Sequence, residues 1–268
     1  MLFDLQSPGR QRVIKVVYTL LAVLLAVGLV GFGIGSSATG GLSEIFGGGG
    51  SSDTGFEDDI DDAQARVDAN PKNERAQLQL ATLYLQQGNS QLDADTSTGQ
   101  TVLTTDAEES FNKAADAWDA YLKQKPAKPD DGIALQIAGT FFLLAQNADS
   151  GADARSQVEA AAEAQQVAAD QNPSKGNLGN LALYYYFAGE FAKGDQAADQ
   201  AVAKSTKAEQ ADLKKQFESI RKQAEAFEKQ LAAEKKQGAQ QGGSNPLEGG
   251  EGGALGGGGL GGGSLGTP

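Results

Sequence analysis

The chain has 268 residues, of which 35 are acidic and 22 basic, and it contains neither cysteine nor histidine. The lack of cysteine excludes a disulfide framework, a thiolate nucleophile and a thiolate metal site. The lack of histidine excludes a Ser-His-Asp triad and histidine-ligated zinc or haem. We therefore expect neither a cofactor nor a metal site.

The charged residues are unevenly distributed along the chain. Residues 53–199 hold 25 acidic and 10 basic residues, a net charge of −15, whereas residues 204–236 hold 9 basic and 6 acidic residues. A body this acidic repels the phosphate backbone of nucleic acids, so we expect no nucleic-acid partner. The mixed charges of 204–236 are typical of a solvated helix face.

An uncharged apolar run of 20 residues, Val16–Gly35, lies near the N-terminus. As a helix it would be about 30 Å long, the thickness of the hydrocarbon core of a bilayer. All the basic residues near it precede the run, so the positive-inside rule places residues 1–12 in the cytoplasm and the body on the extracytoplasmic side. We predict a transmembrane signal-anchor helix over 13–35 in the cell membrane. A signal peptide that is cleaved near Ala38 is the alternative.

Two glycine-rich segments flank the body. Residues 36–55 are mostly Gly and Ser and predict a flexible linker that holds the body off the membrane. The 31 residues from Gly238 to Pro268 include 15 Gly, and Gly at that density does not offset the entropy lost when a backbone becomes ordered. We predict a disordered tail over 238–268.

The body between these segments has a helical pattern. It is rich in Ala, Gln, Leu and charged residues, and its breaks carry stop signals such as Asn-Pro and Gly. We predict an all-α body with a repeat domain over 56–206 and a C-terminal helix over 207–237, and a polar surface loop at 89–105. The predicted helices cover residues 57–69, 73–87, 106–124, 130–147, 152–171, 174–188, 190–204 and 207–236.

A repeated pattern runs through this body. The last repeat matches the signature W-x2-L-G-x2-Y at Leu178, Leu181, Ala182 and Tyr185. Two earlier repeats match it at Leu80, Ala81 and Tyr84, and at Ala134, Ile137, Ala138 and Phe141. On these residues, the chain from 57 to about 206 resembles the tetratricopeptide repeat (TPR) family. The whole chain is similar to a membrane-anchored, extracytoplasmic member of that family.

The resemblance implies an α-solenoid of antiparallel helix pairs that binds peptides or proteins. It assigns to repeat packing the residues Leu80, Ala81, Tyr84, Ile137, Ala138, Phe141, Leu181, Ala182 and Tyr185. It assigns to a concave groove, lined by the first helix of each pair, the residues Arg75, Leu78, Thr82, Leu135, Gly139, Phe142, Leu183 and Tyr186. This lining lacks the Lys, Arg and Asn set that holds a chain terminus in some members, and its apolar character favours a hydrophobic helix or extended segment as ligand. Insertions or neighbouring helices that cover the groove are the alternative.

Four consecutive aromatic residues, Tyr184 to Phe187, stand on one predicted helix. Successive residues of a helix point in different directions, so the four side chains do not share one core face. We expect Tyr186 to be an exposed aromatic contact. Packing of all four between helices is the alternative.

The C-terminal helix carries apolar residues at the spacing of a packing seam, which are Leu213, Phe217, Ile220, Ala224, Phe227 and Leu231. We expect the first half of this seam to cap the last repeat. Beyond about residue 224 we expect the helix to project free, which offers 213–231 as a site of self-association.

Together these patterns predict a membrane-anchored, extracytoplasmic protein that mediates protein–protein interactions as a scaffold, assembly factor or chaperone-like adaptor and is not an enzyme. One alternative is a self-assembling structural protein of the cell envelope that pairs through its C-terminal helix. A carboxylate-based envelope glycosidase is a further alternative, and it needs a deep cleft with two carboxyl groups about 5–9.5 Å apart.

Overall fold

The computed structural model describes residues 56–94 and 101–241. The predicted transmembrane helix over 13–35 and the predicted linker over 36–55 lie outside these residues. Of the predicted tail over 238–268, residues 242–268 also lie outside them, whereas 238–241 belong to the last helix. Within the described ranges, no helix combines the length and the apolar character that crossing a membrane requires.

The described residues form eight α-helices and one short pair of strands, so the prediction of an all-helical body is confirmed. The helices are α3 (Phe56–Ala69), α4 (Glu74–Ser90), α5 (Thr105–Lys123), α6 (Asp131–Gln146), α7 (Gly151–Gln171), α8 (Lys175–Phe187), α9 (Phe191–Ala203) and α10 (Gln210–Gln241). The chain divides into two compact units, 1–231 and 232–268, and the helical body up to Leu231 of α10 lies in the first.

Polar side chains cap the N-termini of five helices. In each case the residue before the helix accepts a hydrogen bond from a backbone N–H three residues further on, which satisfies one of the N–H groups left free at a helix start. The capping pairs are Asn73 with Ala76, Thr104 with Ala107, Asp130 with Ile133, Ser150 with Asp153 and Ser174 with Asn177, at 2.8–3.1 Å. These caps explain why the five helices begin where they do.

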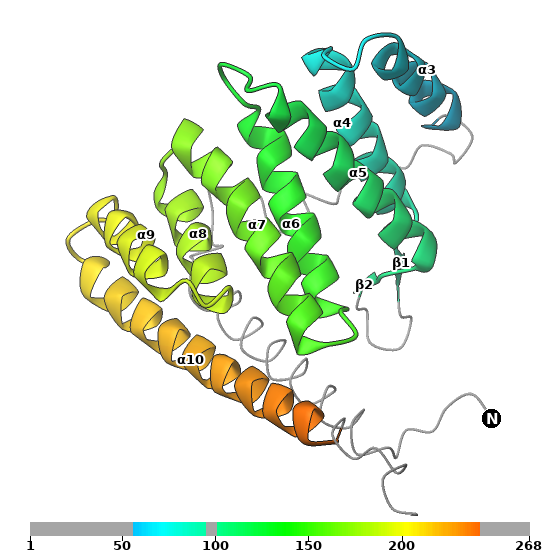
Figure 1. The fold of residues 1–268 in the computed structure, drawn as a ribbon. Coiled ribbons are helices and arrows are strands. Elements are labelled where there is room, and N and C mark those ends of the chain that lie inside the picture. The colour runs from blue at the N-terminus through cyan, green and yellow to red at the C-terminus, as the bar shows by residue number, and fades with distance from the viewer. Residues whose placement is uncertain (1–55, 95–100, 242–268) are drawn as a thin grey trace, which may run out of the picture. The chain divides into compact units, whose positions relative to one another are not determined.

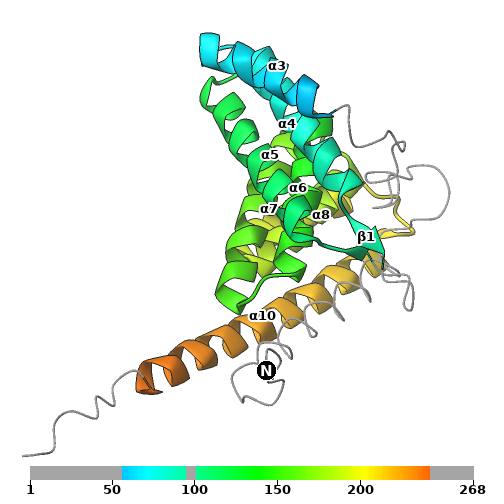
Figure 2. The same ribbon diagram turned by 90° about the vertical axis from the view of Figure 1, so that its right-hand side faces the viewer.

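The helices pack as successive pairs: α4 with α5, α6 with α7, and α8 with α9. We call α4, α6 and α8 the first helices of these pairs and α5, α7 and α9 the second helices. α3 packs on α4 in the position of a second helix whose own first helix is not among the described residues, and we count it with the second helices. α8 also packs on α7. Figures 1 and 2 show α5 and α7 in one layer and α4, α6 and α8 in another.

Small residues allow the two helices of a pair to approach closely. Gly88 of α4 lies against the ring of Phe111 of α5, and Gly194 of α9 lies against the ring of Tyr186 of α8. A Cβ atom at Gly88 or at Gly194 would lie 2.5 Å from the nearest ring carbon. Many of the fully buried core residues are alanines, and such interiors tolerate little added volume.

The segment predicted as a polar loop at 89–105 contains the two short strands. β1 (Asp93–Ala94) and β2 (Thr101–Val102) are antiparallel, with Asp93 opposite Val102. The hydroxyl of Thr104, which caps α5, donates a hydrogen bond of 2.9 Å to the backbone oxygen of Gln91. This bond fastens the end of the segment to the end of α4.

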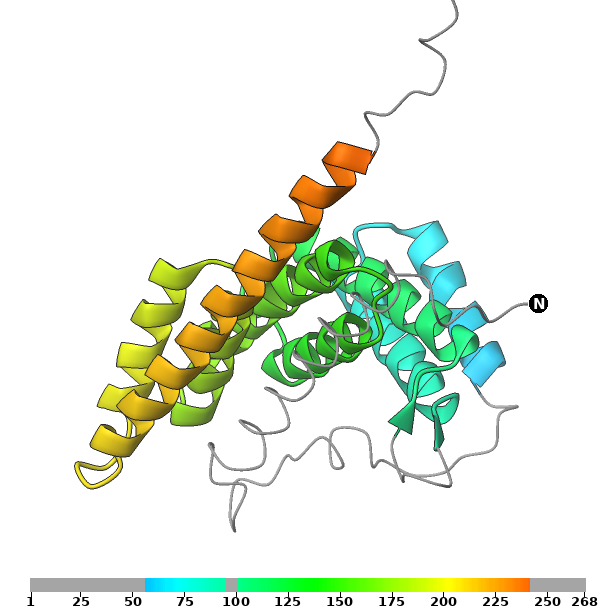
Figure 3. The same cartoon turned by 90° about the horizontal axis from the view of Figure 1, so that it is seen from below.

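α10 runs along the last helix pair (Figure 3), and its apolar seam packs into the core of the body. The seam residues buried in the body are Leu213, Phe217, Ile220, Ala224 and Phe227, and Leu231 is half-buried. The ring centroids of Phe227 and Phe187 of α8 are 6.1 Å apart. The expectation that α10 projects free beyond about residue 224 is therefore wrong as far as Phe227, because α8 offers an aromatic partner there.

Three ion pairs fasten α10 and the residue before it to three different helices. The pairs are Lys175 of α8 with Glu209 at 3.0 Å, Asp195 of α9 with Arg221 at 3.4 Å, and Arg155 of α7 with Glu228 at 2.9 Å. All six side chains keep some exposure to solvent, so each pair adds little stability by itself. Their positions along α10 instead define how it lies on the body.

We predict that Gly194→Ala destabilises the protein by about 1–3 kcal/mol, because the added methyl group overlaps the buried ring of Tyr186. Gly139→Ala is the matched control, since a Cβ atom there meets nothing within 4 Å and Ala favours a helix by about 0.5–1 kcal/mol. Urea unfolding followed by circular dichroism measures both variants. Equal midpoints would contradict the close packing of α9 on α8.

The carboxylate of Glu209 accepts hydrogen bonds from the backbone N–H of Thr206, from Lys175 and from the Thr206 hydroxyl. These bonds favour the charged form and lower the pKa of Glu209 to about 2. Because this folded-state pKa lies below the ordinary value of 4.5, the stabilisation is complete above pH 4.5 and is lost as the pH falls toward 2.

Glu209→Gln is therefore expected to lower the Tm at pH 7 and to have a smaller effect at pH 2.5. Thermal unfolding at the two pH values measures this difference. Glu163→Gln, at an exposed carboxylate of α7, is the control and is expected to leave the Tm nearly unchanged. A Glu209→Gln effect that is the same at both pH values would be inconsistent with the proposed role of the charge.

Candidate functional site

The first helices carry the residues that the sequence assigns to a groove. Arg75 of α4 is exposed, whereas Leu78 and Thr82 of α4 and Leu135 and Phe142 of α6 are half-buried. Two groove residues of α8, Leu183 and Tyr186, are buried, with 9% and 2% of their surface exposed. The accessible part of the predicted groove therefore lies on α4 and α6.

The residues assigned to repeat packing lie mainly in the core. Buried among them are Leu80, Ala81, Ile137, Ala138, Leu181, Ala182 and Tyr185. Tyr84 and Phe141 are half-buried and pack against that core. On α4 and α6, the residues assigned to packing are thus mostly more buried than those assigned to the groove. On α8, both sets are buried.

The expectation that Tyr186 is an exposed contact is wrong, because all four aromatic residues of α8 pack between helices. The ring of Tyr184 lies 5.4 Å from that of Phe142 of α6, and the Tyr185 hydroxyl donates a 2.9 Å hydrogen bond to Gln166 of α7. The Tyr186 hydroxyl donates one of 2.9 Å to Asp195 of α9. Burial, and then this bond to a carboxylate, raise the pKa of Tyr186, so its hydroxyl stays protonated and remains a donor.

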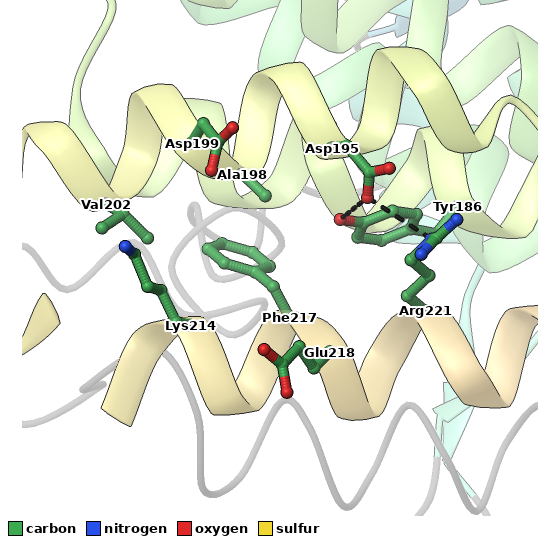
Figure 4. A pocket seen from close by; sticks show the side chains of 9 residues that line it. All are labelled: Tyr186, Asp195, Ala198, Asp199, Val202, Lys214, Phe217, Glu218 and Arg221. Atoms are coloured by element: carbon green, nitrogen blue, oxygen red, sulfur yellow. Dashed lines mark hydrogen bonds and ion pairs between the residues drawn. The ribbon is translucent and has the colours of Figure 1, made fainter. Parts of the chain in front are cut away.

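A crevice of about 380 Å³ lies between α9 and α10 (Figure 4). At one end Asp195 accepts from Tyr186 and pairs with Arg221, as the dashed lines show. Further along, Asp199 of α9 and Lys214 of α10 line it. Its walls therefore carry charges of both signs, and the contacts at this end form a network that joins α8, α9 and α10.

Sequence reasoning missed this network. Asp195 and Arg221 each follow directly after a residue that packs in the core, Gly194 and Ile220 respectively. A charged residue at the flank of a packed stripe reaches the neighbouring helix, but the sequence does not say which helix lies there. The apolar seam of α10 and the aromatic run of α8 were the signals in the sequence that α8 would be covered.

A second hollow, of about 510 Å³, lies between α7 and α9 above α8. We call it the furrow. Leu178 and Leu181 of α8 are among the buried residues that line it, and Gln196 and Gln200 of α9 are exposed on one wall. None of the residues assigned to the concave groove lines this furrow.

Charge is segregated between the helices of the pairs. The second helices α3, α5, α7 and α9 together carry 17 acidic and 5 basic residues. The charged residues of the first helices α4, α6 and α8 are Glu74, Arg75, Asp131 and Lys175. All four stand at the first or second position of their helix, so the rest of the first-helix layer is uncharged.

We predict that Tyr186→Phe lowers the free energy of unfolding by about 1–2 kcal/mol, because it removes a hydrogen bond to a carboxylate and leaves the ring in place. Tyr84→Phe is the matched control, since the Tyr84 hydroxyl makes no hydrogen bond within the described part of the chain. Urea denaturation compares the two variants. Equal stabilities would show that the Asp195 bond contributes nothing to the packing of α8.

Comparisons with known proteins give little further guidance. No protein-family model matches the sequence, and no curated protein matches it. Among solved structures, the crystal structure of MamA matches with 15% sequence identity and a TM-score of 0.37, over 76% of this chain and 99% of the MamA chain. An identity and a TM-score at this level assign neither a family nor a function to the chain.

Proposed function

We propose that this protein is a membrane-anchored, TPR-like scaffold that binds a partner protein on the extracytoplasmic side, through the first-helix layer. The observation that carries the proposal is the lack of charge on this layer beyond the first turn of each helix. Helix surfaces that face water usually carry charged or polar residues. A layer that keeps half-buried Leu78, Leu135 and Phe142 instead suits an apolar segment of a partner.

The pairing of the helices supports the same proposal. Each first helix packs against a second helix whose surface is acidic, so the two layers differ in the partner they suit. An acidic layer keeps the body soluble and discourages unspecific association. On this proposal, the uncharged layer is the surface that an apolar segment of a partner binds.

The anchor and the location rest on sequence. The apolar run Val16–Gly35 and the basic residues before it support a single-pass anchor with a cytoplasmic N-terminus. The absence of His and Cys from the chain supports a role in binding and not in catalysis. Self-assembly through 213–231 is less favoured, because the body already buries the seam of α10.

We predict that Leu135→Glu reduces capture of the partner at least tenfold, since a carboxylate on the uncharged layer must lose its water when the partner binds. The native and variant chains would be crosslinked in their own cells and captured by an affinity tag. Leu122→Glu, at a half-buried leucine of the second helix α5, is the matched control. Helical content measured by circular dichroism checks that each variant folds.

Thr82→Lys provides a second test that does not alter an apolar core contact. Loss of the same captured protein with Leu135→Glu and Thr82→Lys, but not with Leu122→Glu, is the expected result. Unchanged capture by both first-helix variants in folded protein would contradict binding at this layer. Recovery of the chain itself as the sole captured protein would favour the self-assembling alternative.

A further inference from the structure

The furrow is formed because two second helices flank one first helix. α7 and α9 both pack on α8, and the small side chains of Ala169 and Ala197 leave a hollow between them. Leu178 and Leu181 of α8, each 3% exposed, lie at its base. A volume of about 510 Å³ is within the range of protein ligand sites.

The charges at the furrow already have partners. Asp170 accepts a hydrogen bond of 2.5 Å from Gln166, and Gln166 accepts one of 2.9 Å from Tyr185. Lys193 pairs with Glu190 and lies over the ring of Tyr185 at 5.2 Å from its centroid. Asp170 and Lys193 are the two charged residues that line the furrow, and their charges are opposite. In an otherwise acidic layer, the lining of the furrow therefore has a net charge of zero.

Two amide side chains at the furrow have no such engagement. Gln196 and Gln200 are exposed on α9 and make no hydrogen bond or ion pair within the residues that the structure describes. Each amide offers both a donor and an acceptor. Together the two amides can therefore accept from the N–H groups and donate to the C=O groups of a peptide main chain.

The spacing of these amides fits an extended peptide. Residues four apart on a helix lie about 6 Å apart along its axis. Groups on the same side of an extended chain repeat every two residues, or about 6.6 Å. Gln196 and Gln200 thus match the repeat of main-chain groups along one edge of such a chain.

We propose that the furrow binds an extended, uncharged peptide segment of a partner protein. Its main chain pairs with Gln196 and Gln200, and its alternate side chains are small and apolar and face Ala169, Ala197 and the two leucines. This inference rests on the proposed protein-binding function but concerns the second-helix side. An experiment can therefore reject one of the two proposed binding sites without rejecting the other.

The test selects peptides from a phage-displayed library of random 12-residue sequences against the full chain in lipid nanodiscs. Selected peptides are then synthesised with a fluorescent label, and their Kd is measured by fluorescence anisotropy. The expected consensus is uncharged, with small apolar residues at alternate positions. Gln196→Ala/Gln200→Ala should raise the Kd about tenfold, as the loss of two neutral hydrogen bonds implies.

The control is Gln230→Ala, which removes an exposed amide from α10 and should leave the Kd unchanged. A single variant, Gln200→Glu, places a charge at the furrow without removing volume. It should raise the Kd more than Gln196→Ala/Gln200→Ala does. All these substitutions are at exposed positions, so we expect the fold to be retained, and circular dichroism checks this.

Peptides that bind the Gln196→Ala/Gln200→Ala variant as well as the native chain, but bind Leu135→Glu weakly, would overturn the furrow proposal and leave the first-helix function standing. A charged consensus, or a library without any enriched sequence, would also overturn it. In those cases crosslinked capture in cells still decides the proposed function separately.

Discussion

The run of four aromatic side chains on α8 holds the C-terminal half of the body together. Successive residues of a helix are rotated by about 100°, so one run reaches neighbours on all sides. The contacts are Tyr184 with Phe142 of α6, Tyr185 with Gln166 of α7, Tyr186 with Asp195 of α9 and Phe187 with Phe227 of α10. α8 is consequently enclosed. The contacts of its four aromatic side chains fix the positions of the helices around it.

Enclosing α8 decides where the protein can bind. The first-helix layer is accessible on α4 and α6, where half-buried apolar residues stand without charged neighbours beyond the first turn. On the other side, α7 and α9 are separated by α8, and small residues between them leave the furrow. Both candidate surfaces therefore follow from the packing of α8. The acidic surface of the second helices outside the furrow discourages unspecific association.

The sequence predicts the helices well because their signals are local. Capping residues such as Asn73, Ser150 and Ser174 stand directly before the helices they cap, and the predicted bounds of α3 to α9 agree with the structure within three residues. Tyr186 was misplaced because its environment is non-local: Gly194 and Arg221 lie on helices that follow it in the chain. The furrow was missed for the same reason, since its walls come from α7 and α9. These are second helices, and the groove assignment used the first helices alone.

The central claim is that a partner binds the uncharged first-helix layer, and position-specific photocrosslinking tests it most directly. Benzoylphenylalanine would be placed at Leu135 of α6 and, in a separate chain, at the exposed Glu163 of α7, and each chain would be irradiated in its own cells. The account predicts one specific adduct from position 135 that position 163 does not form. The same adduct from both positions, or an adduct from position 163 alone, would contradict it.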